Sequence, residues 1–238
     1  MKFPWSSPIP PASPSTPATA PARLRRIRSI LRWLSLGLLA LLVLLGALAW
    51  GAVRQSWPVE SGRLQLAGLT APVEVVRDPQ GLPQIYAETT EDLIFAQGYI
   101  QAQDRFWQMD IWRHVGSGRL AEVFGEGQVE TDLFLRTLGW EAIAEREWEQ
   151  IQREDADLET VLSQYAAGVN AYLADRQGTE LSLEHGILGL LNRNYQPAPW
   201  TPVNSLTWAK VMAYDLCKNL DDERLRLALK QILPPERV

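Results

Sequence analysis

The stretch EDLIFAQGYIQAQDRFWQMDIWRH, at residues 91–114, decides how this chain of 238 residues folds. Thr89 and Thr90 precede it, and a threonine hydroxyl at such a place can cap a helix by accepting a hydrogen bond from the first turn. Gly116 and Gly118 follow it and favour a helix end. We predict one amphipathic helix over 91–114, because its apolar residues recur at steps of three and four. These residues are Leu93, Ala96, Ile100, Trp107 and Ile111.

A β-hairpin is predicted just before this helix. Residues 73–88 read VEVVRDPQGLPQIYAE, with Val, Ile and Tyr on both sides of the sequence from Asp78 to Gly81. Pro79 and Gly81 occupy the second and fourth positions of that sequence, where a β-turn favours proline and glycine. Two short strands joined by this turn are therefore expected.

Further helices are predicted after residue 118. A short helix over 119–124 should end at Gly125, and a longer helical pattern runs from about Thr131 into the 150s. Thr201 and Pro202 are typical of the N-cap and first position of a helix. The predicted fold is mainly α with an N-terminal β-hairpin. Other helical signals are the apolar stripes Leu158, Leu162, Tyr165, Val169 and Tyr172 within 157–176 and Leu206, Ala209, Ala213 and Leu216 after Pro202, and a helix start at Asp221 and Asp222 that continues through Leu229.

The first 53 residues are not built like a globular domain. Residues 4–22 are mostly Pro, Ser, Ala and Thr, so we expect residues 1–32 to form a disordered, basic, Pro/Ala-rich tail. Residues 33–53 hold no charge over 21 positions. A helix of that length spans roughly 30 Å, the thickness of the hydrocarbon core of a bilayer. This predicts a transmembrane helix at 33–53 that acts as a signal anchor, a linker at 54–72 and a folded region at 73–238.

The distribution of charge predicts how this segment is oriented in a membrane. Residues 1–32 hold six basic residues and no acidic one, whereas the remaining residues hold 17 basic and 28 acidic residues. Arginines just before an apolar span favour a cytoplasmic N-terminus, so we expect the acidic region in the periplasm or extracellular space. An acidic surface also argues against a nucleic-acid partner. Ala47-Leu48-Ala49 leaves a cleaved signal peptide as the alternative.

The sequence shows no nucleophile motif. His114 is expected to cap a helix end and His185 to be an ordinary side chain, and no other histidine is present. Cys217 is expected to be a small packing residue, and a single cysteine excludes an intramolecular disulfide and a Cys-rich zinc site. Residues 116–121 match the dinucleotide pattern GxGxxA, but a helix precedes them instead of a strand, which favours a helix-to-helix turn.

Several longer sequence pieces carry a resemblance to a known family. They are GLPQIYA at 81–87, GYIQAQDRFWQM at 98–109, GRLAEVFG at 118–125 and YAAGVNA at 165–171. In this order and spacing, the chain from Val73 onward resembles the N-terminal (α) region of the penicillin acylases, the penicillin amidase family of N-terminal-nucleophile hydrolases. One difference is Gln84, where this family usually has histidine.

The resemblance implies an amidohydrolase that cleaves N-acyl bonds, as in β-lactam side chains or acyl-homoserine lactones. In the family the precursor cuts itself into two chains, and the serine that becomes the N-terminus of the second (β) chain is the nucleophile, with its own α-amine as base. The oxyanion hole also lies in the second chain. This chain would therefore hold no catalytic residue, and it would contribute part of an αββα sandwich. Its last residues, LPPERV at 233–238, do not resemble a docked domain end, so we expect a truncated N-terminal fragment.

The resemblance also implies a calcium ligand and one wall of an acyl pocket in this chain. Counting forward from Trp200-Thr201-Pro202, which matches the family's W-x-P, places the ligand at Glu223 and the pocket at Ala213, Leu216 and Cys217. From the residues alone, Glu223 and its acidic neighbours fit a charged helix start as well as an oxygen site for a structural calcium ion. An aromatic residue often stands at the place of Cys217 in the family.

Two other interpretations stay open. The chain could be a non-enzymatic, membrane-anchored helical module that binds a partner through its aromatic residues, or a degenerate acylase relative that has lost its chemistry. Within the shared motif, Asp104 and Arg105 are expected to form a buried ion pair or a helix cap. Gln103, Gln108 and Met109 are expected to pack against the second chain.

Overall fold

The computed structural model of the chain describes residues 22–193, 195–217 and 219–234, and it divides into two units, 1–50 and 51–238. The tail predicted at 1–32 lies outside the described residues as far as residue 21, but its residues 22–32 are helical and not disordered. The last four residues of the predicted fragment end also lie outside the described residues. The predicted apolar helix is present as α1 (Ala22–Gln55). Within it, the 26 residues 30–55 are long and apolar enough to cross a membrane.

The hairpin is confirmed. Strand β1 (Glu74–Arg77) pairs with β2 (Pro83–Tyr86) in an antiparallel arrangement that places Val75 opposite Ile85. The Gly81 N–H donates to the Asp78 carbonyl oxygen at 2.9 Å, which closes the predicted turn. The Asp78 carboxylate then accepts the Leu82 N–H at 2.8 Å, so one aspartate orders the whole connection.

The long central helix, α2 (Thr90–Ser117), is confirmed together with both of its ends. Thr89 caps it by accepting a hydrogen bond from the Asp92 N–H, and Gly118 ends it in the left-handed conformation with φ 59°. The predicted inner face is wrong in most positions: Leu93, Ile100, Trp107 and Ile111 are only half-buried, and Ala96 alone is buried. The apolar side chains that α2 buries are Phe95, Ala96, Tyr99, Ala102, Phe106 and Met109.

A kink interrupts α2 at Arg105. Arg105 departs from helical geometry, with φ −141° and ψ 18°, inside α2. The sequence gives no sign of this kink, because neither glycine nor proline stands there. The buried residues Phe95, Tyr99, Ala102, Phe106 and Met109 still follow steps of four and three, so the prediction chose the wrong face of the helix and not the wrong period.

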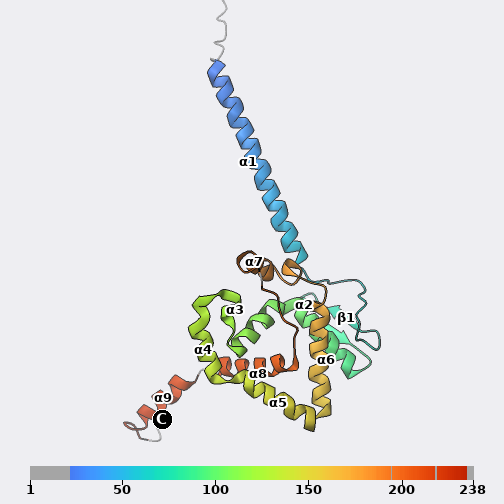
Figure 1. The fold of residues 1–238 in the computed structure, drawn as a ribbon, viewed down its shortest axis with the longest axis vertical. Helices are drawn as coiled ribbons and strands as arrows, with labels where there is room; N and C mark the ends of the chain where they lie inside the picture. Colours follow the sequence, from blue (N-terminus) through green and yellow to red (C-terminus); the bar gives the residue numbers. More distant parts are fainter. Residues whose placement is uncertain (1–21, 194, 218, 235–238) are drawn as a thin grey trace, which may run out of the picture. The chain divides into compact units, whose positions relative to one another are not determined.

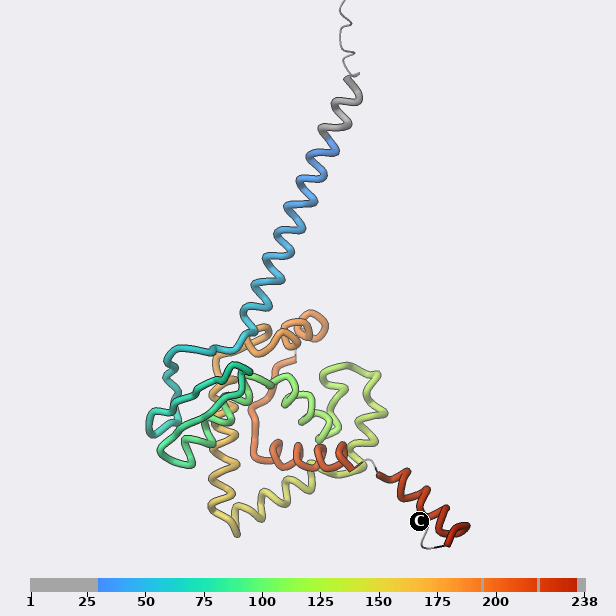
Figure 2. The backbone as a smooth tube through the Cα atoms, turned by 180° about the vertical axis from the view of Figure 1, so that it is seen from behind, coloured from blue at the N-terminus to red at the C-terminus, as the bar shows by residue number. Residues whose placement is uncertain are grey.

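The remaining helices follow α2 in the second unit (Figure 1). The long helical pattern predicted from Thr131 into the 150s is two helices, because Gly139 takes a positive φ of 70° between them. Figure 2 shows the bend there and a second bend near Asp155, which caps the next helix. The elements are α3 (Leu120–Phe124), α4 (Val129–Leu138), α5 (Trp140–Glu154), α6 (Ala156–Leu173), α7 (Leu183–Leu191), α8 (Pro202–Leu216) and α9 (Leu220–Leu229), with short 3-10 helices at Glu126–Gln128 and Gly178–Glu180.

The apolar stripes of α6 and α8 are only partly the buried ones. On α6, Val169 and Tyr172 are buried as predicted, whereas Leu158 is exposed. On α8, Thr207 and Val211 are buried, and they pack where α2 has no side chain, at Gly116. The predicted stripe Leu206, Ala209, Ala213 and Leu216 lies mainly on the outer side of α8.

The core forms where α2 and α6 approach to backbone contact. A Cβ atom on Gly168 would lie 1.9 Å from the Phe95 carbonyl oxygen, and one on Gly98 would lie 2.2 Å from the Tyr165 carbonyl oxygen. Each helix therefore needs a glycine opposite the other helix's backbone. The core cluster around this contact is Tyr99, Ala102, Phe106, Met109, Ala166, Val169, Tyr172, Leu181 and Trp200.

The glycine contact makes a direct stability prediction. Gly168→Ala should lower the free energy of unfolding by about 1–3 kcal/mol or more, because the added methyl group must push α2 and α6 apart. Urea unfolding of the full chain in detergent, followed by circular dichroism, measures this loss. Gly189→Ala in α7 is the control, since its Cβ would meet no atom within 4 Å. An equal effect of the two substitutions would contradict the close contact.

Candidate functional site

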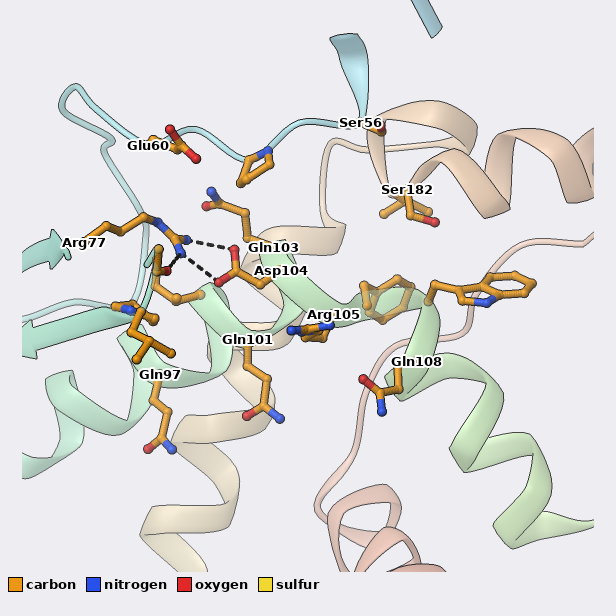
Figure 3. A pocket seen from close by; sticks show the side chains of 18 of the residues that line it. Ser56, Glu60, Arg77, Gln97, Gln101, Gln103, Asp104, Arg105, Gln108 and Ser182 are labelled. Atoms are coloured by element: carbon orange, nitrogen blue, oxygen red, sulfur yellow. Dashed lines mark hydrogen bonds and ion pairs between the residues drawn. The ribbon is translucent and has the colours of Figure 1, made fainter. Parts of the chain in front are cut away.

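A depression in the second unit has a volume of about 1010 Å³ and lies over the kink of α2. Its walls come from four separate parts of the chain: residues 56–60, the hairpin turn, the middle of α2 and the start of α7. Figure 3 shows glutamine side chains of α2, among them Gln97, Gln101 and Gln108, along one part of it. The depression is thus a surface of mixed polar and apolar side chains that only the folded chain assembles.

An ion pair fixes one side of this depression. Arg77 on β1 donates to both carboxylate oxygens of Asp104 on α2, at 2.8 and 2.9 Å, and to the Gly81 carbonyl oxygen at 3.1 Å. The predicted pairing of Asp104 with Arg105 is wrong, because the kink leaves Arg105 exposed on the surface. The bidentate pair instead holds the hairpin against α2.

The polar residues next to Asp104 divide between core and surface. Gln103 is buried and donates to the Val59 carbonyl oxygen at 3.0 Å, which attaches the segment after α1 to α2. Met109 belongs to the core. Gln108 is exposed and available to another chain.

A buried carboxylate lies one turn of α2 beyond the depression. Asp110 has no exposed surface and accepts hydrogen bonds from Arg113 Nε at 2.8 Å, from His185 Nε2 at 3.0 Å and from the Tyr195 hydroxyl. Burial acts to raise the pKa of Asp110, but these hydrogen bonds and the Arg113 charge hold that pKa below its ordinary value. The carboxylate is therefore ionised and fully partnered.

Both histidines belong to this cluster, so their predicted roles need correction. His114 is buried, and its Nδ1 bonds the Asp110 carbonyl oxygen at 2.7 Å, whereas a helix-end cap would be solvated. Burial lowers the pKa of His114, which favours the neutral imidazole. His185 is buried as well, with its ring stacked on Phe106 at a centroid distance of 5.3 Å.

His185 also links a hydroxyl to the carboxylate. Its Nδ1 lies 2.9 Å from Ser182 Oγ, so Ser182, His185 and Asp110 have the connectivity of a hydrolytic triad. Two contacts oppose a catalytic role. Ser182 caps α7 by accepting the His185 N–H at 3.2 Å, and Arg113 already neutralises Asp110 from 2.6 Å. We interpret the three residues as a structural clamp.

The turn after α2 is closed to phosphate. The Leu120 and Ala121 N–H groups, which a phosphate would need, donate to the Asp132 carboxylate at 2.7 and 2.8 Å. The structure therefore agrees with a helix-to-helix turn at residues 116–121.

The residues predicted by resemblance lie away from these sites. Ala213, Leu216 and Cys217 are exposed at the end of α8, and none of the three depressions described by the structure includes them. Glu223 is exposed on α9 and accepts a hydrogen bond from Arg226 at 2.9 Å. Within the described ranges, no three His, Cys, Asp or Glu side chains gather as a metal site. Gln84 is exposed and accepts from the Tyr86 hydroxyl at 3.0 Å.

The buried carboxylate can be tested by removing its charge. Asp110→Asn should destabilise the chain by about 3–5 kcal/mol, because it leaves the Arg113 guanidinium buried without a counter-charge. The same substitution at the more exposed pair, Asp104→Asn, should cost about 1 kcal/mol or less. Thermal and urea unfolding of both variants measure the difference, and equal losses would show that Asp110 does not organise the cluster.

Comparisons with known proteins place the chain among the acylases. Residues 72–238 match the family model described as penicillin amidase. The penicillin acylase 2 proenzyme of Pseudomonas sp. strain SE83 is 40% identical over 155 residues, which cover 65% of this chain and 19% of that protein. The acyl-homoserine lactone acylase QuiP of Pseudomonas aeruginosa is 35% identical over 193 residues, which cover 80% of this chain and 22% of that protein.

A solved structure agrees with the sequence comparisons. The thermostable penicillin G acylase from Alcaligenes faecalis matches 70% of this chain and 86% of its own chain, with a TM-score of 0.50 and 32% identity. The chain spans about a fifth of the length of the curated relatives it matches. Because the family model covers everything from residue 72 onward, the chain belongs to the penicillin amidase family.

Proposed function

We propose that this chain is the N-terminal region of an amidohydrolase that cleaves N-acyl amide bonds, such as those of β-lactam side chains or acyl-homoserine lactones. The observation that carries the proposal is the family match over residues 72–238. Relatives named as a penicillin acylase and as an acyl-homoserine lactone acylase support this substrate class.

The proposed nucleophile is a serine outside this chain. In the described part of the chain, the serine hydroxyl that bonds an imidazole is that of Ser182, which caps a helix. A serine freed at the N-terminus of a second chain needs no histidine, because its α-amine has a pKa of about 8 and can accept the hydroxyl proton near neutral pH. The proposed oxyanion hole also belongs to that second chain.

Exposed apolar side chains support a second chain as the partner. The hairpin exposes Val75, Val76 and Tyr86, and two strands alone are marginally stable, so we propose that they join a larger sheet of an αββα sandwich. Helix α4 exposes Leu133 and Phe134 in the same unit. Ala213, Leu216 and Cys217, exposed at the end of α8, are proposed as one wall of the acyl pocket.

The proposed location is the cytoplasmic membrane. The apolar part of α1 has the length of a single span, and the basic residues before it favour a cytoplasmic N-terminus with the folded region in the periplasm. An uncleaved anchor at 33–53 would hold the enzyme at the outer surface of that membrane.

Calcium is proposed as a structural ion with Glu223 as one ligand. Calcium takes six to eight oxygen ligands, and Glu223 by itself supplies at most two. Glu223 alone does not complete a calcium site, and we propose that the remaining ligands lie downstream, outside this chain. The exposed position of Glu223 on α9 fits a ligand shared in this way.

The complete precursor should cut itself into two chains at a serine. Changing that serine to alanine should abolish both the cleavage and the hydrolysis of phenylacetyl amides and acyl-homoserine lactones, because nucleophile and base are lost together. Gel electrophoresis and an amide-release assay measure the two activities. Residues 1–238 expressed alone should be inactive. Cleavage that continues in the alanine variant, or hydrolysis by this chain alone, would contradict the proposal.

Loss of the proposed calcium ligand should remove the effect of calcium on the same precursor. In Glu223→Gln, calcium should no longer raise the melting temperature relative to a sample with chelator, whereas the unsubstituted precursor should gain stability. Asp221→Asn is the matched control, because Asp221 is an exposed carboxylate on the same helix. An unchanged calcium effect in Glu223→Gln would reject this ligand.

A further inference from the structure

Helix α7 carries apolar side chains on two opposite sides. His185 and Leu188 are buried, whereas Ile187, Leu190 and Leu191 are 52%, 78% and 84% exposed. The steps of three and four residues place these three side chains on one outer face. A contiguous exposed apolar patch is typical of a surface that binds a protein or a membrane.

The chain just after the apolar span lies beside the start of α7. Gln55 is the last residue of the span 30–55, and its side-chain oxygen accepts a hydrogen bond from Thr179 Oγ1 at 2.7 Å. Ser56, Ser182 and Leu183 line the same depression, in which Figure 3 labels both serines. The α7 region is therefore attached, within the folded unit, to a residue just after the proposed span at 33–53.

Residues around this attachment suit a membrane boundary. The Arg54 guanidinium lies 4.9 Å from the centre of the Trp57 ring, and tryptophan and arginine are typical of the headgroup region. Arg193 is exposed two positions after the end of α7, where it could reach lipid phosphates. Glu184, in the first turn of α7, is exposed at the edge of the apolar face.

We propose that α7 lies on the lipid surface, with Ile187, Leu190 and Leu191 inserted at the boundary between headgroups and acyl chains. This inference rests on the membrane anchor in the proposed function. A lipid surface fits the position of this face, because the hydrogen bond between Thr179 and Gln55 holds the α7 region beside the chain that continues into the apolar segment. Lipid accepts a small apolar face without hydrogen-bond partners.

Fluorescence quenching by lipid tests this proposal on the full chain. The background substitution Cys217→Ser removes the single cysteine of the sequence. The substitution Leu190→Cys then introduces one cysteine, which is labelled with an environment-sensitive fluorophore. Labels at Gly46 in the apolar segment and at exposed Leu158 on α6 are the controls. Each protein is placed in vesicles of phosphatidylcholine and phosphatidylglycerol that contain a nitroxide-labelled lipid. Circular dichroism checks that every variant is folded.

The label at position 190 should lose most of its emission, as the label at position 46 should, while the label at position 158 keeps its emission. Quenching at 46 without quenching at 190 would overturn the contact of α7 and leave the anchor intact. Quenching at neither position would overturn both. Quenching at 190 alone would support the lipid contact and reject the span.

Discussion

One ionised carboxylate without solvent contact determines how much of the second unit fits together. Burying an unpaired charge costs far more free energy than a surface ion pair contributes. Asp110 therefore needs strong hydrogen-bond donors on every side. Arg113, His185 and Tyr195 supply them from three separate parts of the chain. Arg113 also donates to the Ala198 carbonyl oxygen at 2.8 Å, so the segment before α8 is held by the same group. The position of the irregular segment between α7 and α8 thus follows from one charge on α2.

The kink at Arg105 separates α2 into two parts that contact different elements. Before the kink, Asp104 holds the hairpin through Arg77, and Gly98 brings α6 into contact. After it, Asp110 gathers the histidine cluster. The depression lies where the two parts meet, which is why its walls come from the hairpin, α2 and α7 together.

Structural features that depend on neighbouring residues can be predicted from the sequence. Features that depend on residues far apart in the chain cannot. The turn at Asp78–Gly81, the caps of α2 and α8 and the end at Gly118 all follow from local chemistry, and the structure confirms them. The triad-like clamp joins positions 110, 182 and 185, which no spacing rule connects. The two histidines were therefore misjudged from local context. The inner faces of α2 and α8 were misjudged because a glycine, rather than an apolar side chain, marks the closest approach.

Gly98 and Gly168 can serve as alignment marks. At these two positions a carbonyl oxygen of the opposite helix occupies the space of a side chain, so substitution is constrained from both partners at once. Elsewhere along α2 and α6, residues of different size can exchange while the helices keep their distance. A distantly related sequence can therefore be aligned with this chain by first locating the small residues that correspond to Gly98 and Gly168, before any polar motif is compared.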